Sequence, residues 1–173
     1  MERMLAAVVE DRRALSVAMD ALLQPRERMR PVPLHTVQGL VTGLLTKDPC
    51  LATLRVRCAV VALEPEAFAS HLDVMGQEGW LHADALMAAQ VAVSNLPVDM
   101  MQVVGGRLAW SPSPEARRVA LHCLVRDAAD GRGWTEERLA MLAEFQRDAS
   151  PLVAGAAQFV FPPREMVKAP KDA

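Results

Sequence analysis

The chain has 173 residues, which is enough for one compact domain or one short array of repeats and leaves little room for a second domain. Hydrophobic residues make up 51% of it but aromatic residues only 4%, so its apolar mass is alanine, leucine, valine and methionine, a composition that favours helices over strands. A net charge of −2 and an isoelectric point near 6.1 provide no global basic field for binding phosphates, which argues against nucleic acid as a partner.

The N-terminal part of the chain predicts one amphipathic helix followed by a loop. Residues 2–23 carry apolar side chains along one stripe and most of their charges off it, which indicates a helix. Residues 24–33 contain three prolines and are expected to form a loop. The first apolar run is too short for a signal peptide, and no run approaches the roughly 20 apolar residues of a membrane span. We therefore expect a cytoplasmic protein without a membrane segment.

Prolines then punctuate the chain at regular intervals. Pro33, Pro65 and Pro97 are each 32 residues apart, and each is followed by an apolar-periodic run of about a dozen residues. A second series of helix starts falls between them, at Pro49, near His82, at Pro114 and at Pro151. Two interleaved series with one period predict a helical hairpin that is repeated along the chain.

The residues at matching positions of the two series support this register. Seven residues past the three first-series prolines stand the bulky residues Leu40, Leu72 and Val104. Leu142 continues this series after a longer step. The matching positions of the second series are small: Ala59, Ala89, Ala120 and Ala157. Small side chains let helices approach closely, so we interpret this alternation as a packing pattern.

We expect a leading helix and four hairpins, in one all-helical domain over residues 1–163. The predicted helix pairs are 34–46 with 49–63, 65–76 with 81–95, 97–109 with 114–128, and 135–147 with 151–161. The expected stops are Gly76 and Gly79, Gly131 and Gly133, and Pro162-Pro163. The expected starts include Ser113, followed by proline, and Thr135, followed by two glutamates.

Two segments of the sequence run against regular helix. Gly105-Gly106 lies inside a predicted helix, where each glycine costs about 1 kcal/mol relative to alanine, so we expect that helix to end early or to kink there. Residues 164–173 are charged and contain proline, and we expect them to form a disordered tail.

Two second-series helix starts resemble HEAT-type repeats. The matching residues are Asp148, Pro151, Val153 and Ala156-Ala157 in one, and Pro114, Arg117, Arg118, Val119 and Ala120 in the other, while Asp48-Pro49 matches the turn only. The chain departs from the consensus in three ways. Ala154 stands where arginine is expected in the last repeat, the second repeat lacks the aspartate-proline turn, and the repeat period is shorter than usual. Over about residues 33–161 the resemblance implies an all-α, right-handed superhelical stack of about four HEAT-like hairpins behind an N-terminal capping helix. It also implies that the second helices line the inner surface, where partners bind.

Four polar residues form the densest candidate for a metal site. His71 and Asp73 make one His-x-Asp pair, and His82 and Asp84 make another. Histidine and carboxylate ligate zinc or iron, but residues two apart on a helix point about 200° away from each other. Helix capping and surface solvation are therefore the preferred interpretation, and we predict no metal and no cofactor.

The cysteines also lack a pattern that would indicate a site. Cys50, Cys58 and Cys123 are odd in number and have no CxxC spacing, which favours buried reduced thiols. His122 adjoins Cys123, but adjacent helical residues diverge by about 100°, so packing is preferred over a nucleophile–base pair. No hydrolase, phosphate-loop or zinc-protease motif occurs, and we predict no catalytic residue.

Arginines on the second-series helices are the predicted binding residues. Arg55, Arg57, Arg117 and Arg118 could engage carboxylates or phosphates of a protein partner. The alternative is that they pair with acidic residues of the neighbouring repeat.

The preferred function is a non-catalytic cytoplasmic adaptor or regulatory subunit that uses the second-helix face. One alternative is an enzyme on a HEAT-like scaffold, similar to a DNA glycosylase or a chromophore lyase, although the acidic isoelectric point and the tryptophans near hairpin ends disfavour a glycosylase. The other alternative is an oligomer or a structural subunit that is stable only within a larger complex.

Overall fold

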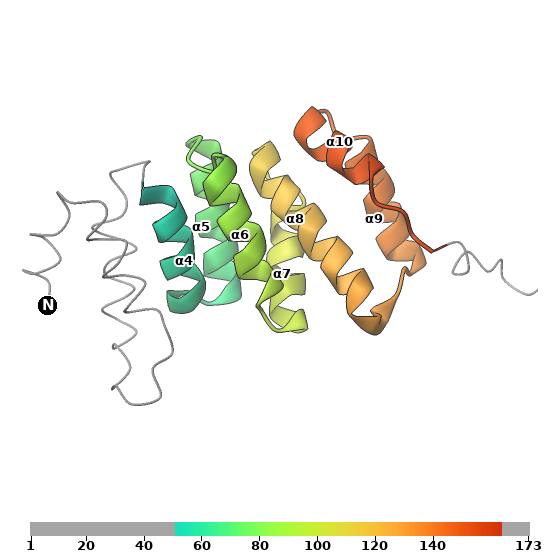
Figure 1. Ribbon diagram of the computed structural model, residues 1–173, viewed down its shortest axis with the longest axis horizontal. Coiled ribbons are helices and arrows are strands. Elements are labelled where there is room, and N and C mark those ends of the chain that lie inside the picture. Colours follow the sequence, from blue (N-terminus) through green and yellow to red (C-terminus); the bar gives the residue numbers. More distant parts are fainter. Residues whose placement is uncertain (1–50, 164–173) are drawn as a thin grey trace, which may run out of the picture.

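The computed structural model describes residues 51–163, and this part of the chain is helical without a strand (Figure 1). Its elements are α4 (Ala52–Ala62), α5 (Pro65–Gln77), α6 (Ala83–Ser94), α7 (Val98–Leu108), α8 (Pro114–Asp127), a π-helical turn η3 (Ala128–Arg132), α9 (Glu136–Gln146) and α10 (Pro151–Gln158). For the described residues the all-helical class and the helices predicted between residues 51 and 161 are confirmed, with α10 ending three residues earlier than expected. None of the described helices is long and apolar enough to cross a membrane. The predicted helices at 2–23 and 34–46, the loop at 24–33 and the tail at 164–173 lie outside the described residues.

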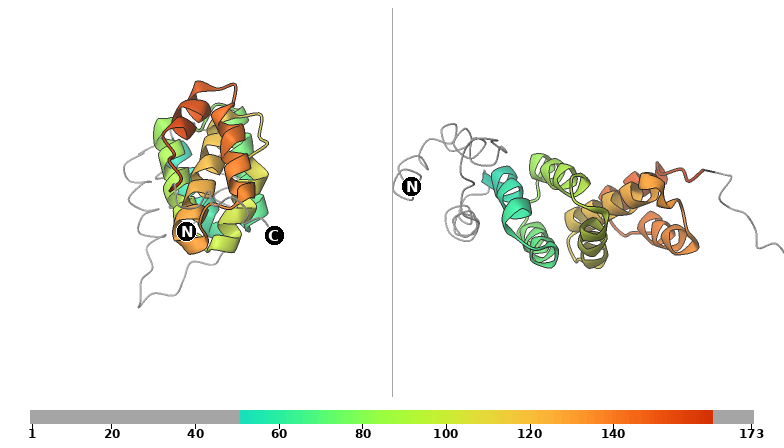
Figure 2. Two further views of the ribbon diagram at one scale, coloured as in Figure 1. Left: turned by 90° about the vertical axis from the view of Figure 1, so that its right-hand side faces the viewer. Right: turned by 90° about the horizontal axis from the view of Figure 1, so that it is seen from below.

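The helices pack as successive neighbours in an elongated arrangement (Figures 1 and 2). The second-series helices form one row, in which α4 packs on α6, α6 on α8, and α8 on α10. In the first series α5 packs on α7, whereas α9 packs mainly on α10 and less extensively on α8. The last hairpin therefore joins the array chiefly through α10 and α8.

The matched positions of the two series form the core between these helices. The bulky first-series residues are buried: Leu72, Val104 and Leu142. The small second-series residues are buried as well: Ala59, Ala89, Ala120 and Ala157. The interpretation of the alternation as a packing pattern is confirmed for these positions, and Leu40 lies outside the described residues.

Helix starts follow the predicted capping chemistry. The Ser113 side chain accepts a hydrogen bond from the Ala116 backbone N–H at 3.3 Å, and Thr135 accepts one from the Arg138 N–H at 3.3 Å. Each side chain satisfies one backbone donor that the first helical turn leaves open. The sequence thus specifies where α8 and α9 begin.

The helix stops require a correction. Gly79 and Gly133 adopt positive φ angles of 74° and 69°, which suits a glycine that ends a helix. Gly76, in contrast, lies inside α5 against Ser113, and Gly131 lies inside the π-helical turn that extends α8. Only one glycine of each predicted pair therefore ends its helix.

The prediction that the helix ends early at Gly105-Gly106 is wrong, because α7 continues through both glycines to Leu108. A side chain at Gly105 would place its Cβ 2.8 Å from the Cβ of Cys123 on α8. The glycine permits α7 and α8 to approach closely, and this packing offsets its low helix propensity.

Candidate interaction surface

Each second-series helix presents a ridge of side chains that points away from the core. In a helix, a residue two positions from a buried alanine points about 200° away from it, toward the outside. The residues two before and two after the alanine are four apart, so both lie on the same outer face. On α4, α6 and α8 these pairs are Arg57 and Val61, Met87 and Val91, and Arg118 and His122. Successive helices of this row are in contact, so the three pairs lie side by side on one surface, which we call the second-helix face.

The α4–α6 part of this face is apolar and hollowed. Val61, Met87 and Val91 are 54%, 63% and 57% exposed. They line a groove of about 540 Å³ between the two helices, to which Arg57 and Asp84 contribute charged side chains. Exposed apolar side chains that gather in one groove are typical of an interaction site rather than of an ordinary surface.

The α8 part of the face is basic. Arg118, His122 and Arg126 follow each other at intervals of four residues along one side of α8. Arg118 is half-buried, and burial lowers the pKa of its guanidinium. The His122 Nε2 lies 2.7 Å from the Ser94 hydroxyl oxygen. Burial, followed by the charges of the two arginines, lowers the pKa of His122 and so favours its neutral imidazole.

Arg55 and Arg117, two of the four predicted binding arginines, are bound within the fold. Arg55 is only 5% exposed, so it does not present the exposed guanidinium that its predicted role in binding requires. Its Nε donates to His71 Nε2 at 3.0 Å, and its guanidinium carbon lies 4.7 Å from the centre of the Trp80 ring. Arg117 binds the Asp148 carboxylate with Nε and Nη2 at 2.6 and 2.9 Å. The alternative of pairing with a neighbouring repeat therefore holds for Arg117, and Arg57 and Arg118 remain on the second-helix face.

The two His-x-Asp pairs do not assemble a site. His71 accepts the hydrogen bond from the buried arginine described above, and burial lowers its pKa to about 4. Asp73 accepts hydrogen bonds from Gln77 and a serine of the α7–α8 loop. His82 and Asp84 are exposed at the start of α6, and the His82 side chain makes no capping hydrogen bond there. Within residues 51–163 no group of three or more histidine, cysteine and acidic side chains is positioned to hold a metal ion.

The two described cysteines are buried free thiols. Burial raises the pKa values of Cys58 and Cys123 to about 12, which keeps both in the unreactive thiol form. Cys123 packs toward Gly105 while His122 binds Ser94, so the adjacent histidine and cysteine do not form a dyad. Cys50 lies outside the described residues.

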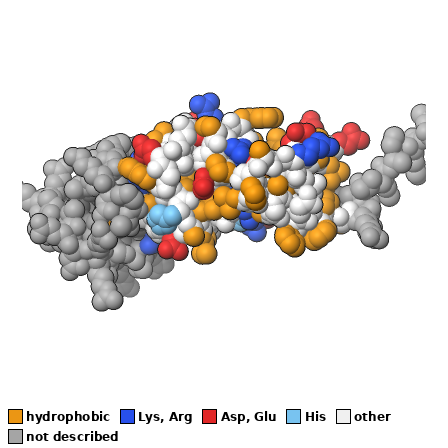
Figure 3. Space-filling model, turned by 90° about the horizontal axis from the view of Figure 1, so that it is seen from above, with side chains coloured by type: hydrophobic (Ala, Val, Ile, Leu, Met, Phe, Trp, Pro, Cys, Tyr) orange, Lys and Arg blue, Asp and Glu red, His pale blue; other side chains and the backbone are white. Residues whose placement is uncertain are grey.

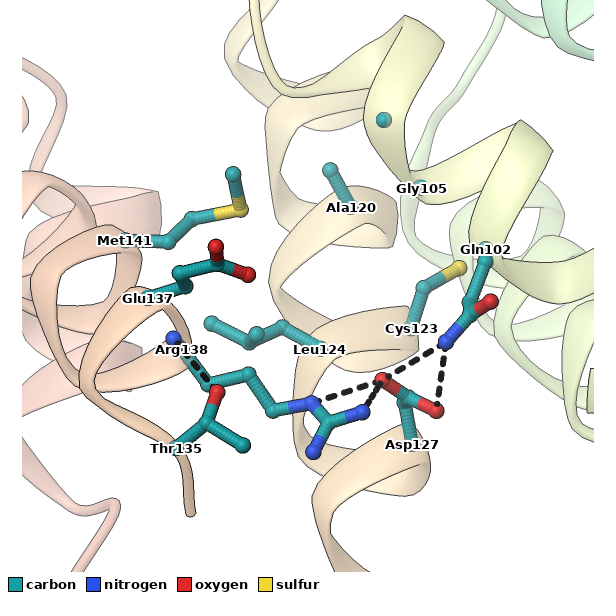
Figure 4. Close-up of a pocket in the computed structure, with 11 residues that line it drawn as sticks. Gln102, Gly105, Ala120, Cys123, Leu124, Asp127, Thr135, Glu137, Arg138 and Met141 are labelled. Carbon is teal, nitrogen blue, oxygen red and sulfur yellow. Dashed lines mark hydrogen bonds and ion pairs between the residues drawn. The ribbon is translucent and has the colours of Figure 1, made fainter. Parts of the chain in front are cut away.

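A second hollow, absent from the sequence predictions, lies between α7, α8 and α9 (Figure 4). It has a volume of about 300 Å³, and the Asp127 carboxylate lies at one side of it. This carboxylate accepts hydrogen bonds from Gln102 Nε2 at 3.1 Å and from Arg138 Nε at 2.8 Å. The network ties α7 and α9 to the end of α8, and it satisfies the buried charge from within the fold.

One signal in the sequence could have pointed to this network. Asp127 stands at the C-terminal end of α8, where the helix dipole disfavours a negative charge. A carboxylate in that position needs a cation or several donors, which Arg138 and Gln102 supply. The sequence alone did not indicate which of its arginines would do so.

Charged side chains of both signs are mixed on the face of the molecule that Figure 3 shows. Acidic and basic side chains of the described residues are scattered there among exposed hydrophobic ones, without a continuous basic surface. This distribution agrees with the isoelectric point and gives no support to a nucleic-acid interface.

Comparison with known proteins found no family model, no curated protein and no solved structure that matches the chain. The resemblance to HEAT-type repeats therefore remains a prediction from the sequence motifs.

Proposed function

We propose that this chain is a non-catalytic, cytoplasmic protein-interaction module that binds a protein partner on its second-helix face. The observation that carries the proposal is the groove between α4 and α6, in which Val61, Met87 and Val91 are more than half exposed. A partner that buried the exposed half of each of these side chains would gain half of the roughly 1.5–3 kcal/mol that full burial contributes. The proposal includes a right-handed, HEAT-like superhelical stack, in which this face would be the inner surface.

The arrangement of the rows supports this proposal. The second-series helices contact one another in sequence order, so that their outer ridges form one surface. A surface made from several successive repeats is the usual binding surface of helical arrays. The buried thiols and the internally satisfied Asp127 network offer no comparable support for catalysis.

The test is affinity capture from the source cells with the wild-type chain and with a Met87→Asp/Val91→Asp variant, quantified by mass spectrometry. The wild type should capture a protein in stoichiometric amount, and the variant should capture at least about tenfold less of it. A tenfold loss of affinity corresponds to about 1.4 kcal/mol. A matched control is Met100→Asp/Val103→Asp, which places the same charges on α7 at side chains that are 37% and 38% exposed. Circular dichroism melts establish that both variants fold.

Equal capture by the wild type and the α6 variant, or equal loss with the α7 control, would contradict the proposal. Self-association of the purified wild type that the α6 variant abolishes would show instead that the face joins copies of this chain. That outcome would favour the alternative of a structural subunit.

A further inference from the structure

We infer that the partner segment is an acidic amphipathic one, with apolar side chains that enter the α4–α6 groove and Asp or Glu side chains that reach Arg118 and Arg126 on α8. This inference rests on the proposed function, because it uses the same face. It adds the chemical character of the segment that binds there.

Arg118 is the first reason for an acidic partner. Its guanidinium is half-buried, and it has no hydrogen bond or ion pair with any residue that the structure describes. Removal of a charge from water without a partner is unfavourable, and burial accordingly lowers its pKa. A carboxylate offers the fork of a guanidinium two parallel hydrogen bonds and would supply the missing interaction.

Arg126, two turns further along α8, is the second reason. Its side chain is 42% exposed, and its Nη2 lies 3.6 Å from the Asp130 carboxylate, whose side chain is 38% exposed. An exposed pair at this distance contributes little, so the guanidinium keeps donors available to an incoming acceptor. His122 lies between the two arginines, is bound to Ser94, and adds no negative charge.

The acidic residues of the neighbouring second-series helices do not neutralise this basic side of α8. Within α8 itself, Glu115 accepts a hydrogen bond from Ser113 near the helix start, and Asp127 binds Gln102 and Arg138 on the opposite side. The α6 helix contains one acidic residue, Asp84, in its first turn, and α10 contains no charged residue. Apart from Asp130, which lies 3.6 Å from Arg126, these helices therefore offer no acidic side chain to Arg118 and Arg126.

The positions of the apolar and basic side chains suit one bound segment. The α6 helix, which carries Met87 and Val91, packs on α8, and Ser94, three residues beyond Val91, bonds to His122 between the two arginines. Packed helices lie about 8–10 Å apart, a distance that neighbouring faces of one amphipathic helix can bridge. Its apolar face would lie between α4 and α6, with its acidic flank toward α8.

The experiment is a selection of random 16-residue peptides, displayed on phage, against the immobilised full-length chain. We expect the enriched peptides to combine several large apolar residues with a net negative charge. A synthetic version of the most enriched peptide should bind at least about tenfold more weakly to Arg118→Gln/Arg126→Gln and to Met87→Asp/Val91→Asp. Binding should be unchanged with Arg107→Gln, a control that removes an exposed arginine from α7. Thermal melts followed by circular dichroism establish that each variant is folded.

The outcomes separate this inference from the proposed function. Enrichment of basic or uncharged peptides that still require Met87 and Val91 would overturn the acidic character and leave the interaction face standing. Binding that is lost with Met87→Asp/Val91→Asp but unchanged with Arg118→Gln/Arg126→Gln would do the same. A selection that yields no peptide sensitive to either double variant would overturn both.

Discussion

Two adjacent glycines of α7 have opposite surroundings, which makes them a matched pair for testing the packing of the array. A Cβ at Gly105 would meet the Cβ of Cys123 at 2.8 Å, whereas a Cβ at Gly106 would meet nothing within 4 Å. We expect Gly105→Ala to lower the free energy of unfolding by about 1–3 kcal/mol through overpacking. We expect Gly106→Ala to raise it by about 0.5–1 kcal/mol, because alanine loses less backbone entropy in a helix.

Urea denaturation of the two variants beside the wild type measures both changes. If Gly105→Ala stabilised the protein as much as Gly106→Ala does, the close approach of α7 and α8 at this point would be contradicted.

Arg55 and Arg57 show what the sequence could and could not predict for single residues. The buried Ala59 fixes which side of α4 faces the core. Arg57, two residues away, accordingly points outward, and Arg55, four residues away, points inward. Both were predicted as binding residues because they lie on a second-series helix, and the resemblance to HEAT-type repeats implies that these helices line the surface where partners bind. The His71 and Trp80 side chains that accommodate Arg55 come from other elements, and no local pattern indicates them.

Between elements, the ion pair of Arg117 and Asp148 joins α8 to the turn before α10. Its nitrogen–oxygen distances are 2.6 and 2.9 Å, and both side chains are mostly buried. We expect Asp148→Asn to destabilise the fold by about 1–3 kcal/mol at pH 7, because the charge-assisted pair with Arg117 is lost. The weaker hydrogen bond from the Ser150 backbone N–H can still be accepted by the asparagine side-chain oxygen. A matched control is Glu144→Gln, which breaks the exposed pair with Arg147 and should change stability by less than about 0.5 kcal/mol.

This difference in stability should depend on pH in a definite direction. The hydrogen bond from Arg117 holds the pKa of Asp148 below its usual value of 3.8, so the folded state favours the charged carboxylate. The stabilisation is complete above that value and is lost as the pH falls through the lower pKa of the folded state. Urea unfolding of wild type and Asp148→Asn should therefore converge below about pH 3.8. A gap that stayed constant down to acid-induced unfolding would mean that the pair contributes through packing alone.

The elements themselves were largely predictable, whereas the placement of the last hairpin was not. Helix starts depend on local chemistry, such as the proline after Ser113 or the cap at Thr135, and local chemistry is visible in sequence. The position of α9 depends on the bonds of Asp127 to Gln102 and Arg138. These residues are 25 and 11 positions away from Asp127, and nothing in the repeat pattern pairs them.

For the whole molecule, composition predicted the all-helical class because alanine, leucine and methionine favour helices and strand-forming aromatic residues are scarce. The candidate site was predictable only in part. The second-helix face followed from the repeat, but the apolar groove on it depends on which valines and methionines the folded helices leave exposed. Hydrophobic residues in an amphipathic pattern are ordinarily assigned to the core, so Met87 and Val91 gave no separate signal.

The linear order of contacts predicts that stability is not uniform along the array. Within the described residues α8 packs against α5, α6, α7, α9 and α10, whereas α10 packs mainly on α8 and α9. In such arrays each unit is stabilised by its neighbours, so an element with fewer neighbours opens more readily. We expect hydrogen exchange followed by mass spectrometry to show slower exchange in α8 than in α10.

Two substitutions distinguish local opening from global unfolding. Val153 of α10 and Val104 of α7 are both fully buried, and truncation of either to alanine removes two methyl groups, at a cost of about 2 kcal/mol. Val153→Ala should speed exchange in α9 and α10 and leave α5 to α7 unchanged, because α10 can open while the remaining helices keep their contacts. Val104→Ala should speed exchange in α7 and in its two main neighbours, α5 and α8, because opening of α7 exposes its contacts with each of them. If Val153→Ala instead raised exchange equally in all helices, the chain would unfold as one cooperative unit, and the nearest-neighbour description would fail.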